Sequence, residues 1–579
     1  MAEATSPAAK EMPEAPEKTL EDLEYAGRRH GPRLAMVLSV IAAVWSIFQL
    51  WIASPLPFFF KFGIIVDVPA RGIHLAFGLL LCFLTYPAVR SRTSRIPVYD
   101  LILALAGAGC AFYLFVGYEG LVARQGVLFG YDVSLLGVDF SLPVEAILGG
   151  IGILLLLEAT RRSIGLPLVV VCSIFLIYSV FGQSMPDIVS HKGVSLTRLI
   201  GYQWLGGEAI FGIPINVSVS FVFLFVLFGA LLDKAGAGRY FLDMAFALVG
   251  RYRGGPAKAA ILSSGMIGMI SGSSIANVVT TGTFTIPVMR RIGLPAVKAG
   301  AIEVAASTNG QIMPPIMGAA AFIIAEFVGI SYFDVIIAAF IPAVISYMAL
   351  LYISHLEALK LGLSGLPKNE IPPLRQTFLG GVHFLIPIII LIYLLMVKRW
   401  TASSAVFYSL IAIMIIIVMQ HVVSAVLGAT TSIGQAFMSG VAQVYAGLVA
   451  GARNMISIAV AVAAAGIIVG AVSSTGLNNA MVGVVEAISG GNVYILLGLT
   501  AVLCILLGMG LPTTANYLVV ASLLAGVVVE LGGAAGLVIP LIAVHLYVFF
   551  YGLMADSTPP VCLAAFAASA ISRADPLKT

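Results

Sequence analysis

Charged residues are scarce in this chain: Asp, Glu, Lys and Arg together make up only 10% of its 579 residues. A soluble globular domain carries about 25% of such residues, so the composition excludes an ordinary soluble protein. The excess of base over acid is also small, 31 residues against 27. A nucleic-acid-binding surface needs clustered positive charge, and we therefore expect no nucleic-acid partner.

Cysteine and histidine are sparse as well, and none of them shows metal-ligand spacing. The five cysteines lie singly in apolar runs, and the seven histidines are scattered. We therefore expect buried free thiols, no disulfide framework and no transition-metal site. The absence of a recognisable nucleophile–base pair argues against an intramembrane enzyme. The absence of a selectivity-filter repeat argues against a channel.

Apolar residues dominate instead, at 60% of the chain with a mean hydropathy of +1.05. About 20 apolar residues cross a bilayer core, so the sequence predicts an all-α polytopic membrane protein embedded in a lipid bilayer. Residues 1–33, which begin rich in Ala, Pro and Glu, predict a disordered cytoplasmic tail. Ordinary spans are expected at 34–53, 72–89, 98–117, 144–160, 164–181, 213–232, 335–353, 378–397, 403–419 and 455–474.

Four further apolar stretches are too long for one straight span and are interrupted near their middle by Gly, Ser, Thr, Asn or Pro. They cover residues 257–289, 294–330, 494–529 and 536–571. We interpret the first and third as re-entrant hairpins, and the second and fourth as broken helices. Unwound backbone inside a bilayer is tolerated only where it lines a polar cavity. These breaks are therefore the predicted functional centre.

The interrupted stretches form two matching pairs about 240 residues apart. The first break, SGSSIAN (271–277), and the third, GMGLPTTAN (508–516), both contain two adjacent hydroxyl residues followed by Ala-Asn, with one Ile inserted in the first. Further breaks follow at 307–315 and 556–560. Residues 213–353 are thus expected to form one repeat and residues 455–579 another. With hairpins entering from opposite sides, 24 of the 31 Lys and Arg residues become cytoplasmic, as the positive-inside rule requires. We therefore expect inverted repeats with both termini cytoplasmic.

The breaks are rich in oxygen from hydroxyls, amides and freed carbonyls, which suit hard alkali cations. The partially positive N-termini of the resumed half-helices suit a carboxylate, and Thr558 with Pro559 is interpreted as an N-cap followed by proline at the first helical position. Inverted repeats with broken helices are the architecture of secondary transporters. The sequence therefore predicts an ion-driven carrier of small organic anions.

Two acids are expected at membrane depth, where an ionisable group is a functional candidate. Asp556 lies in the last break, which indicates an ion-site role. Glu303 precedes the second break and is either a hydrogen-bonded structural acid or a coupling group. If the coupling ion were a proton, these two acids would carry it. By contrast, Glu158 is spaced to pair with Arg162 on one helix face.

At these motifs the sequence resembles the fused permeases of TRAP (tripartite ATP-independent periplasmic) transporters, specifically the TAXI branch. The resemblance runs from about residue 34 to the end. It rests on SGSSIANVVTTGTFTIP (271–287), QIMPP within 301–326, GLPTTAN (510–516), DSTPP within 545–579 and LEATRR (157–162). It implies an elevator-type transporter of the ion-transporter superfamily. Residues 34–181 would be small-subunit-like helices plus a connecting helix, and residues 182–579 the large transport subunit.

The resemblance also implies a site. One sodium site would comprise Ser273, Ser274, Asn277, Asn309 and Gly310, and a second would comprise Gly510, Thr513, Thr514, Asp556, Ser557 and Thr558. Substrate would lie between the hairpin tips, against Ser273, Asn277, Pro314, Thr513, Asn516 and Pro559. Na⁺ would be the coupling ion, with no other cofactor or metal.

The resemblance further implies a partner and a location. A periplasmic solute-binding protein would deliver dicarboxylates or related organic or amino acids to the permease in the bacterial inner membrane. Two alternatives stay open: a stand-alone anion/cation symporter without a binding protein, and an H⁺-coupled variant. A full span at 335–353 follows the first broken helix, whereas no residue follows Thr579. We therefore expect the second repeat to lack its last scaffold helix.

Overall fold

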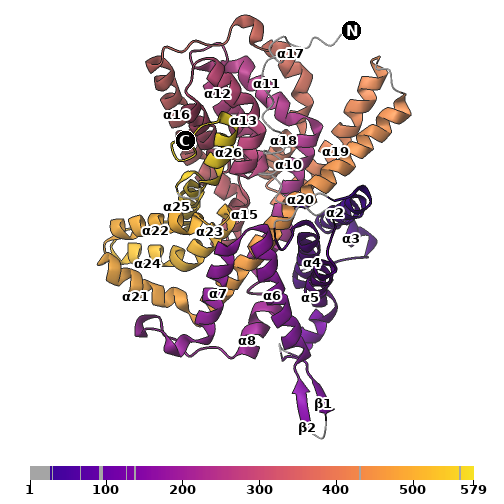
Figure 1. Ribbon diagram of the computed structural model, residues 1–579, viewed down its shortest axis with the longest axis vertical. Coiled ribbons are helices and arrows are strands. Elements are labelled where there is room, and N and C mark those ends of the chain that lie inside the picture. Colours follow the sequence, from indigo (N-terminus) through magenta and orange to yellow (C-terminus); the bar gives the residue numbers. More distant parts are fainter. Residues whose placement is uncertain are drawn as a thin grey trace.

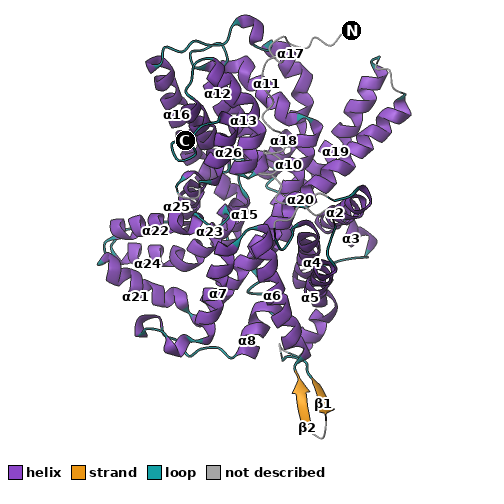
Figure 2. Ribbon diagram, viewed as in Figure 1, coloured by secondary structure: helices purple, strands orange, loops and turns teal. Residues whose placement is uncertain are grey.

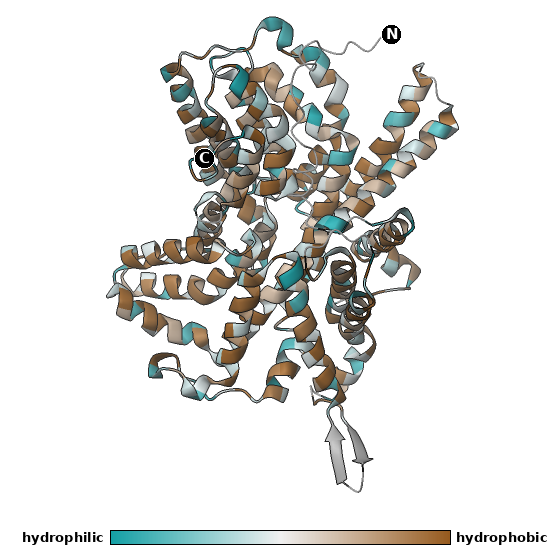
Figure 3. Ribbon diagram, viewed as in Figure 1, coloured by the Kyte–Doolittle hydropathy of each residue, from teal (hydrophilic) through white to brown (hydrophobic). Residues whose placement is uncertain are grey.

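The computed structural model describes residues 27–28, 30–65, 67–89, 95–124, 127–135, 138–428, 432–559 and 562–579. These residues form an elongated, almost entirely helical molecule (Figures 1 and 2). In the described part, nine helices are long and apolar enough to cross a membrane, or up to ten if one bent pair counts as a span. Apolar residues cover most of these helices (Figure 3). The predicted polytopic α-helical class is confirmed, and most of the predicted tail lies outside the described residues.

The N-terminal spans begin and end close to their predicted limits. They are α2 (Pro32–Ala53), α4 (Asp67–Thr85), α5 (Val98–Ala123), α6 (Val144–Ser163) and α7 (Leu166–Val180), with the short helix α3 (Leu56–Phe60) after α2. The predicted ion pair is confirmed: Arg162 Nε lies 2.7 Å from a Glu158 carboxylate oxygen. The five cysteines are free and buried, as expected. Among the described residues, no group of three His, Cys, Asp or Glu could hold a metal ion.

One element was not anticipated, a β-hairpin between α5 and α6. Strands β1 (Tyr131–Leu135) and β2 (Val138–Leu142) pair antiparallel, with Tyr131 opposite Leu142. The hairpin projects from one end of the molecule (Figure 1). The alternation of apolar and polar residues in YDVSL and VDFSL is the period-2 pattern of a strand. This alternation could have predicted the hairpin from the sequence.

Helix α20 (Ile433–Thr475) joins the N-terminal helices to the rest of the chain. Its 43 residues correspond to about 65 Å, twice the span expected at 455–474, because a capping box at Ser432 and Gln435 starts the helix early. It packs against α2, α4, α6 and α7, and also against α10 (Phe223–Ala235) and α19 (Ala402–Val426). Ser46 Oγ of α2 donates a 2.7 Å hydrogen bond to the Leu448 carbonyl of α20.

All four interrupted stretches are helix–break–helix units. In the first half they are α12 (Gly255–Ser271) with α13 (Ser274–Arg291), and α14 (Ala296–Gly310) with α15 (Ala319–Val328). In the second half α22 (Val493–Gly508) is followed by α23 (Thr513–Val520), the π-helical turn η9 (Ala521–Ala525) and α24 (Gly526–Ala534). Then α25 (Leu541–Met554) and the 3₁₀ turn η10 (Ala555–Ser557) are followed by α26 (Leu563–Ser572).

The elements that precede these units also correspond. In the first half α9 (Ile213–Val217), the π-helical turn η5 (Ser218–Val222) and α10 (Phe223–Ala235) end at Gly236. In the second half α20 ends at Gly476. Both glycines are left-handed, with φ of 101° and 69°, a conformation that suits glycine. A 13-residue helix follows each one, α11 (Ala237–Val249) and α21 (Leu477–Ser489).

The remaining elements follow the first half or connect the spans. They are η2 (Gly182–Ser184), η3 (Asp187–Val189), α8 (Leu196–Ile200), η4 (Gly201–Leu205), α16 (Tyr332–Lys360), η6 (Lys368–Glu370), α17 (Leu374–Gly381), η7 (Val382–Phe384), α18 (Leu385–Ile392) and η8 (Tyr393–Val397).

The predicted helix start at Thr558 and Pro559 is wrong. Thr558 is extended after η10, and α26 begins only at Leu563, preceded by Cys562. Pro560 follows Pro559 in the sequence, and a residue before proline is disfavoured in the helical region. Pro559 is therefore a poor first residue for a helix.

The inverted arrangement predicts that both ends of each hairpin lie on one side of the membrane: residues 255 and 292 on the cytoplasmic side, and 491 and 532 on the outer side. A side chain at Gly255 would place Cβ 2.1 Å from the Gly250 carbonyl oxygen. The exposed Arg253 and Arg291 are therefore better probes, with the exposed Ile488 and Ala535 for the second hairpin.

Single cysteines at these four positions, in a variant without the native thiols, test the topology with an impermeant maleimide. We expect residues 253 and 291 to react only in inside-out vesicles, and residues 488 and 535 only in right-side-out vesicles. Reaction of the two ends of either hairpin from opposite sides would contradict the inverted repeat.

Candidate functional site at four helix breaks

The first hairpin turns at Gly272 and Ser273. Gly272 ends α12 in the left-handed conformation, with φ of 64°, which glycine adopts without strain. Ser273 is extended and caps α13, because its Oγ accepts a 3.3 Å hydrogen bond from the Ala276 N–H. Asn277 Nδ2 donates to the Ser264 carbonyl at 2.9 Å. The Asn277 amide therefore ties the two arms of the hairpin together.

The second hairpin is held in the same way. Its break covers residues 509–512, and Asn516 Nδ2 of α23 donates a 2.9 Å hydrogen bond to the Cys504 carbonyl of α22. The side chains of Asn277 and Asn516 are both fully buried, and neither Oδ1 atom has a hydrogen-bond partner. Buried polar atoms without a partner are rare. Each hairpin therefore contains one free, buried amide oxygen at the equivalent position.

Small residues allow the broken helices to approach the hairpins closely. A Cβ added to Gly310 of α14 would lie 2.7 Å from the Gly268 Cα of α12, and one added to Gly508 of α22 would lie 2.5 Å from the Ala555 Cβ. Only glycine fits such contacts. The four breaks are therefore held close enough for their polar groups to meet.

Gln311 lies where the breaks meet. We assign its amide orientation from its hydrogen-bond partners: Nε2 donates to the Gly272 carbonyl and to Thr513 Oγ1, both at 3.2 Å, and Oε1 accepts from the Ser274 N–H at 3.1 Å. Ser274 Oγ in turn donates to an Asp556 carboxylate oxygen at 2.5 Å. Residues from both hairpins and both broken helices thus form one hydrogen-bonded cluster, which we call the Gln311 cluster.

Most of the predicted site residues lie in or beside this cluster. Ser274, Thr513 and Asp556 belong to it, and Ser273 is the adjacent cap. The others nearby are Asn277 and Asn516 behind the two tips, Asn309 and Gly310 in the last turn of α14, Pro314 buried in the loop 311–318, and Thr514 half-buried in the first turn of α23.

Four of the predicted site residues do not take part in the Gln311 cluster. The hydroxyls of Ser557 and Thr558 donate back to the Met554 carbonyl, at 3.0 and 2.6 Å, and Pro559 is exposed. Gly510 faces α7, since a Cβ there would lie 2.6 Å from the Pro167 Cβ. The tip of the second hairpin therefore touches a helix of the N-terminal part.

Glu303 is fully buried between α13 and α14. Its carboxyl accepts hydrogen bonds from the Thr281 and Thr285 hydroxyls and a longer one, 3.4 Å, from Ser307. Ser307 also shares a 2.9 Å hydrogen bond with Ser264. A series of hydrogen bonds thus runs from Glu303 through Ser307 to Ser264, the residue that Asn277 contacts. This geometry fits a hydrogen-bonded structural acid, and it also places the acid next to the first hairpin site.

Sequence reasoning missed Gln311 and Ser264. Gln311 lies directly after the predicted Asn309 and Gly310, inside the QIMPP motif, but the predicted ligands were short amides and hydroxyls. Ser264 lies on the arm opposite Asn277, 13 residues earlier in the sequence. Only a paired hairpin places those two residues together, so nothing in a local pattern pointed to Ser264.

The cluster contains ligands for a cation rather than groups for covalent catalysis. Hydroxyls, amide oxygens and one carboxylate surround the breaks, and the N-termini of α13 and α23 both begin there. Helix N-termini carry partial positive charge and favour anions. The arrangement can therefore bind a small cation and a carboxylate side by side.

The Ser274–Asp556 hydrogen bond joins the two halves of the chain and predicts measurable coupling. We expect S274A and D556N to be non-additive in unfolding free energy, with a coupling of about 1–3 kcal/mol, as for hydrogen bonds to charged groups. A double-mutant cycle in detergent measures it. S557A combined with S274A is the control and should be additive, because Ser557 bonds its own helix. Additivity of S274A and D556N would contradict the contact.

A match to a known protein family covers the part of the chain that holds the breaks. A family model described as "Tripartite ATP-independent periplasmic transporter, DctM component" matches residues 151–579. Uncharacterized protein YgiK of Salmonella typhimurium is 26% identical over 257 residues, which cover 44% of this chain and 53% of that protein.

Two relatives with described transport activity match over shorter stretches. The C4-dicarboxylate TRAP transporter large permease protein DctM of Pseudomonas aeruginosa is 40% identical over 91 residues, 16% of this chain and 21% of that protein. The sialic acid TRAP transporter large permease protein SiaM of Vibrio cholerae is 27% identical over 200 residues, 34% of this chain and 45% of that protein. The matches thus span about half or less of these relatives. By the family match, the chain belongs to the DctM family of tripartite ATP-independent periplasmic transporters, a family of transport proteins and not of enzymes.

Proposed function

We propose that this chain is the membrane permease of a secondary importer that carries small organic anions across the bacterial inner membrane, driven by an ion gradient. The observation that carries the proposal is the Gln311 cluster together with the two free amide oxygens behind the hairpin tips, Asn277 Oδ1 and Asn516 Oδ1. An unpaired buried acceptor costs about 1–3 kcal/mol, and a bound cation removes that cost. Two equivalent oxygens support two cation sites, one in each hairpin.

Sodium is the proposed coupling ion. The first site is assigned to Ser273, Ser274, Asn277, Asn309 and Gly310, and the second to Gly510, Thr513, Thr514, Asp556, Ser557 and Thr558. Divalent hard cations are usually held by several carboxylates, whereas Asp556 is the single carboxylate of the Gln311 cluster. Neutral oxygens with one acid suit a monovalent ion. The hydroxyls of Ser557 and Thr558 donate their hydrogen bonds to the Met554 carbonyl. The lone pairs of their oxygen atoms therefore stay free to coordinate a cation.

The proposed substrate is a carboxylate. The N-termini of α13 and α23 begin beside Gln311, and their partial positive charge stabilises an anion. Ser273, Asn277, Pro314, Thr513, Asn516 and Pro559 are the assigned substrate contacts. Among them, Ser273 and Thr513 lie directly at the tips. C4-dicarboxylate and sialic acid are named for relatives, and both are carboxylates.

We further propose that the chain is a TAXI-type fused permease, with residues 34–181 in the role of the small membrane subunit. Support comes from α20, which packs against α2, α4, α6 and α7, and from the 3.0 Å hydrogen bond between His74 Nε2 and Ser218 Oγ. A periplasmic solute-binding protein would deliver the substrate. The domain that holds the four breaks would then move as an elevator against these helices.

Uptake should depend on sodium if the amide oxygens hold the coupling ion. In proteoliposomes with a cognate binding protein, we expect an inward sodium gradient to drive accumulation of a labelled organic acid, and potassium in its place to abolish it. N277L and N516L each remove one free oxygen and with it one proposed ion site, so each should abolish sodium-driven accumulation. A487L, an equally bulky change at an exposed position of α21, is the control.

A proton-coupled importer would give a different pattern. Uptake driven by a pH gradient alone, unchanged when potassium replaces sodium, would contradict sodium coupling. The E303Q and D556N variants would then be expected to lose uptake driven by the pH gradient.

A further inference from the structure

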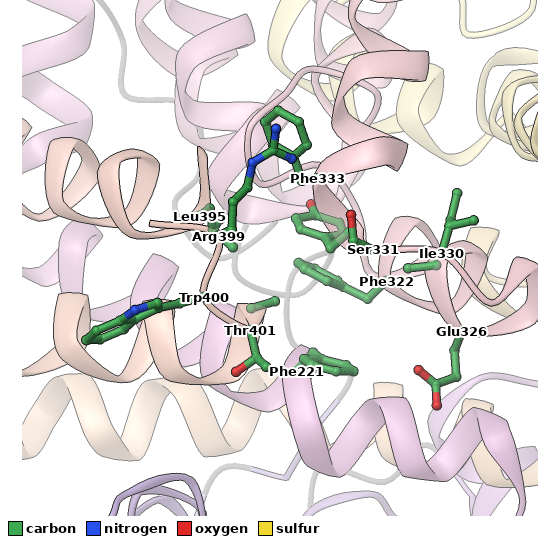
Figure 4. Close-up of a pocket in the computed structure, with 13 residues that line it drawn as sticks. Phe221, Phe322, Glu326, Ile330, Ser331, Phe333, Leu395, Arg399, Trp400 and Thr401 are labelled. Atoms are coloured by element: carbon green, nitrogen blue, oxygen red, sulfur yellow. The ribbon is translucent and has the colours of Figure 1, made fainter. Parts of the chain in front are cut away.

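A second candidate site lies away from the Gln311 cluster. It is a cavity of about 470 Å³ between the α15–α16 turn, η5 and the η8–α19 turn. Its walls are mostly apolar and include Phe221, Phe322, Tyr332, Phe333, Leu395 and Trp400. Polar side chains lie at its margins, Arg399 at one end and Glu326 at the other (Figure 4). We call this cavity the aromatic pocket.

The aromatic pocket lies where three candidate membrane spans begin or end. Helix α16 begins at Tyr332, the span Lys368–Val397 ends before Arg399, and the span Ala402–Val426 begins after it. Trp400 is partly exposed there, and Lys398 lies over the Tyr393 ring. Exposed Trp, Tyr and basic residues at span ends mark the membrane–water boundary, which is the depth of lipid headgroups.

Arg399 is held in place by its backbone and by a ring. Its φ of 57° is left-handed, a conformation that a non-glycine residue rarely adopts. Its guanidinium carbon lies 3.5 Å from the centre of the Phe333 ring. The cation is therefore fixed at the rim of the pocket, where it can meet a phosphate.

Glu326 supplies the opposite charge. In Figure 4 its carboxylate lies across the pocket from Arg399, with Phe322 and Ser331 between them. Arg71 also lies near Glu326, but its guanidinium already contacts the Asp67 carboxylate and the Phe211 carbonyl, at 2.6 and 2.7 Å. Opposite charges therefore lie at the two ends of the pocket.

An apolar path leads from the pocket into the membrane. Phe333, Ile337 and Ile341 recur at four-residue spacing on α16, so they share one helix face. Ile337 and Ile341 are 53% and 66% exposed. Acyl chains could follow this face while the headgroup fills the pocket.

We propose that the aromatic pocket binds one phosphatidylethanolamine molecule, with its phosphate on Arg399 and its ammonium on Glu326. The bound lipid stabilises the first broken helix. Tyr332, in the pocket wall, donates a 3.1 Å hydrogen bond to the Pro315 carbonyl and another to the Ile316 carbonyl. It also stacks on Phe322 at 4.3 Å. An occupant that fixes these rings also fixes the loop that carries Gln311. The inference does not depend on the transported substrate.

Native mass spectrometry of the purified full chain tests the proposal. Phosphatidylethanolamine and phosphatidylcholine with the same acyl chains are added in turn to delipidated protein. We expect the first to bind at least tenfold more tightly, because a quaternary ammonium cannot donate hydrogen bonds to Glu326. E326L, which leaves no hydrogen-bond acceptor at this position, should remove this preference. R399G, which suits the left-handed backbone but lacks the cation, should weaken both lipids at least tenfold.

Matched controls separate the pocket from general lipid binding. K398A removes the neighbouring cation, which does not line the pocket, and E486Q removes an exposed acid on α21; both should bind like the unchanged chain. Glycerophosphoethanolamine, the headgroup without acyl chains, should compete poorly. If R399G bound both lipids as tightly as the unchanged chain, or E326L kept the preference for phosphatidylethanolamine, the lipid assignment would be overturned. Tight binding of the soluble headgroup would also overturn it. All readouts are binding measurements, so a failed transport assay leaves them unaffected.

Discussion

Where a helix breaks inside a membrane, the backbone N–H and C=O groups at the break need new hydrogen-bond partners. In this chain the side-chain amide of Gln311 is such a partner. It bonds the Gly272 carbonyl, the Ser274 N–H and the Thr513 hydroxyl, while Ser274 reaches Asp556. Without these contacts the breaks would expose unpaired groups in a medium of low dielectric constant, at several kcal/mol each. The requirement explains why breaks far apart in the sequence meet at one point. That point is the polar site to which we assign the coupling ions.

Much of this arrangement could be predicted from the sequence, because its determinants are local. Span length and hydropathy predicted the helices, and clusters of Gly, Ser, Thr and Pro located all four breaks. The correspondence between SGSSIAN and GMGLPTTAN predicted two equivalent hairpins, and Asn277 and Asn516 do tie their arms in the same way. The inverted orientation, the sodium sites and the boundaries of the two subunit-like parts remain predictions.

Other features depended on contacts between distant residues and could not be read locally. Gln311 is important because three partners from other segments surround it, and Ser264 because the hairpin folds it against Asn277. The expected cap at Thr558 failed because Pro559 precedes a second proline. Helix α20 extends well beyond its apolar span, since the cap at Ser432 and its contacts with N-terminal helices lengthen it. The aromatic pocket likewise combines residues from segments that no sequence motif connects.

The central claim is that Asn277 and Asn516 each hold one coupling cation through the free amide oxygen. Equilibrium binding of radioactive sodium to the purified chain tests this most directly, with the number of bound ions determined at saturation. The account predicts two ions for the unchanged chain and one for either N277L or N516L, with N277D, which keeps a side-chain oxygen, still binding two. Two ions bound by both leucine variants, or none by the unchanged chain, would contradict it.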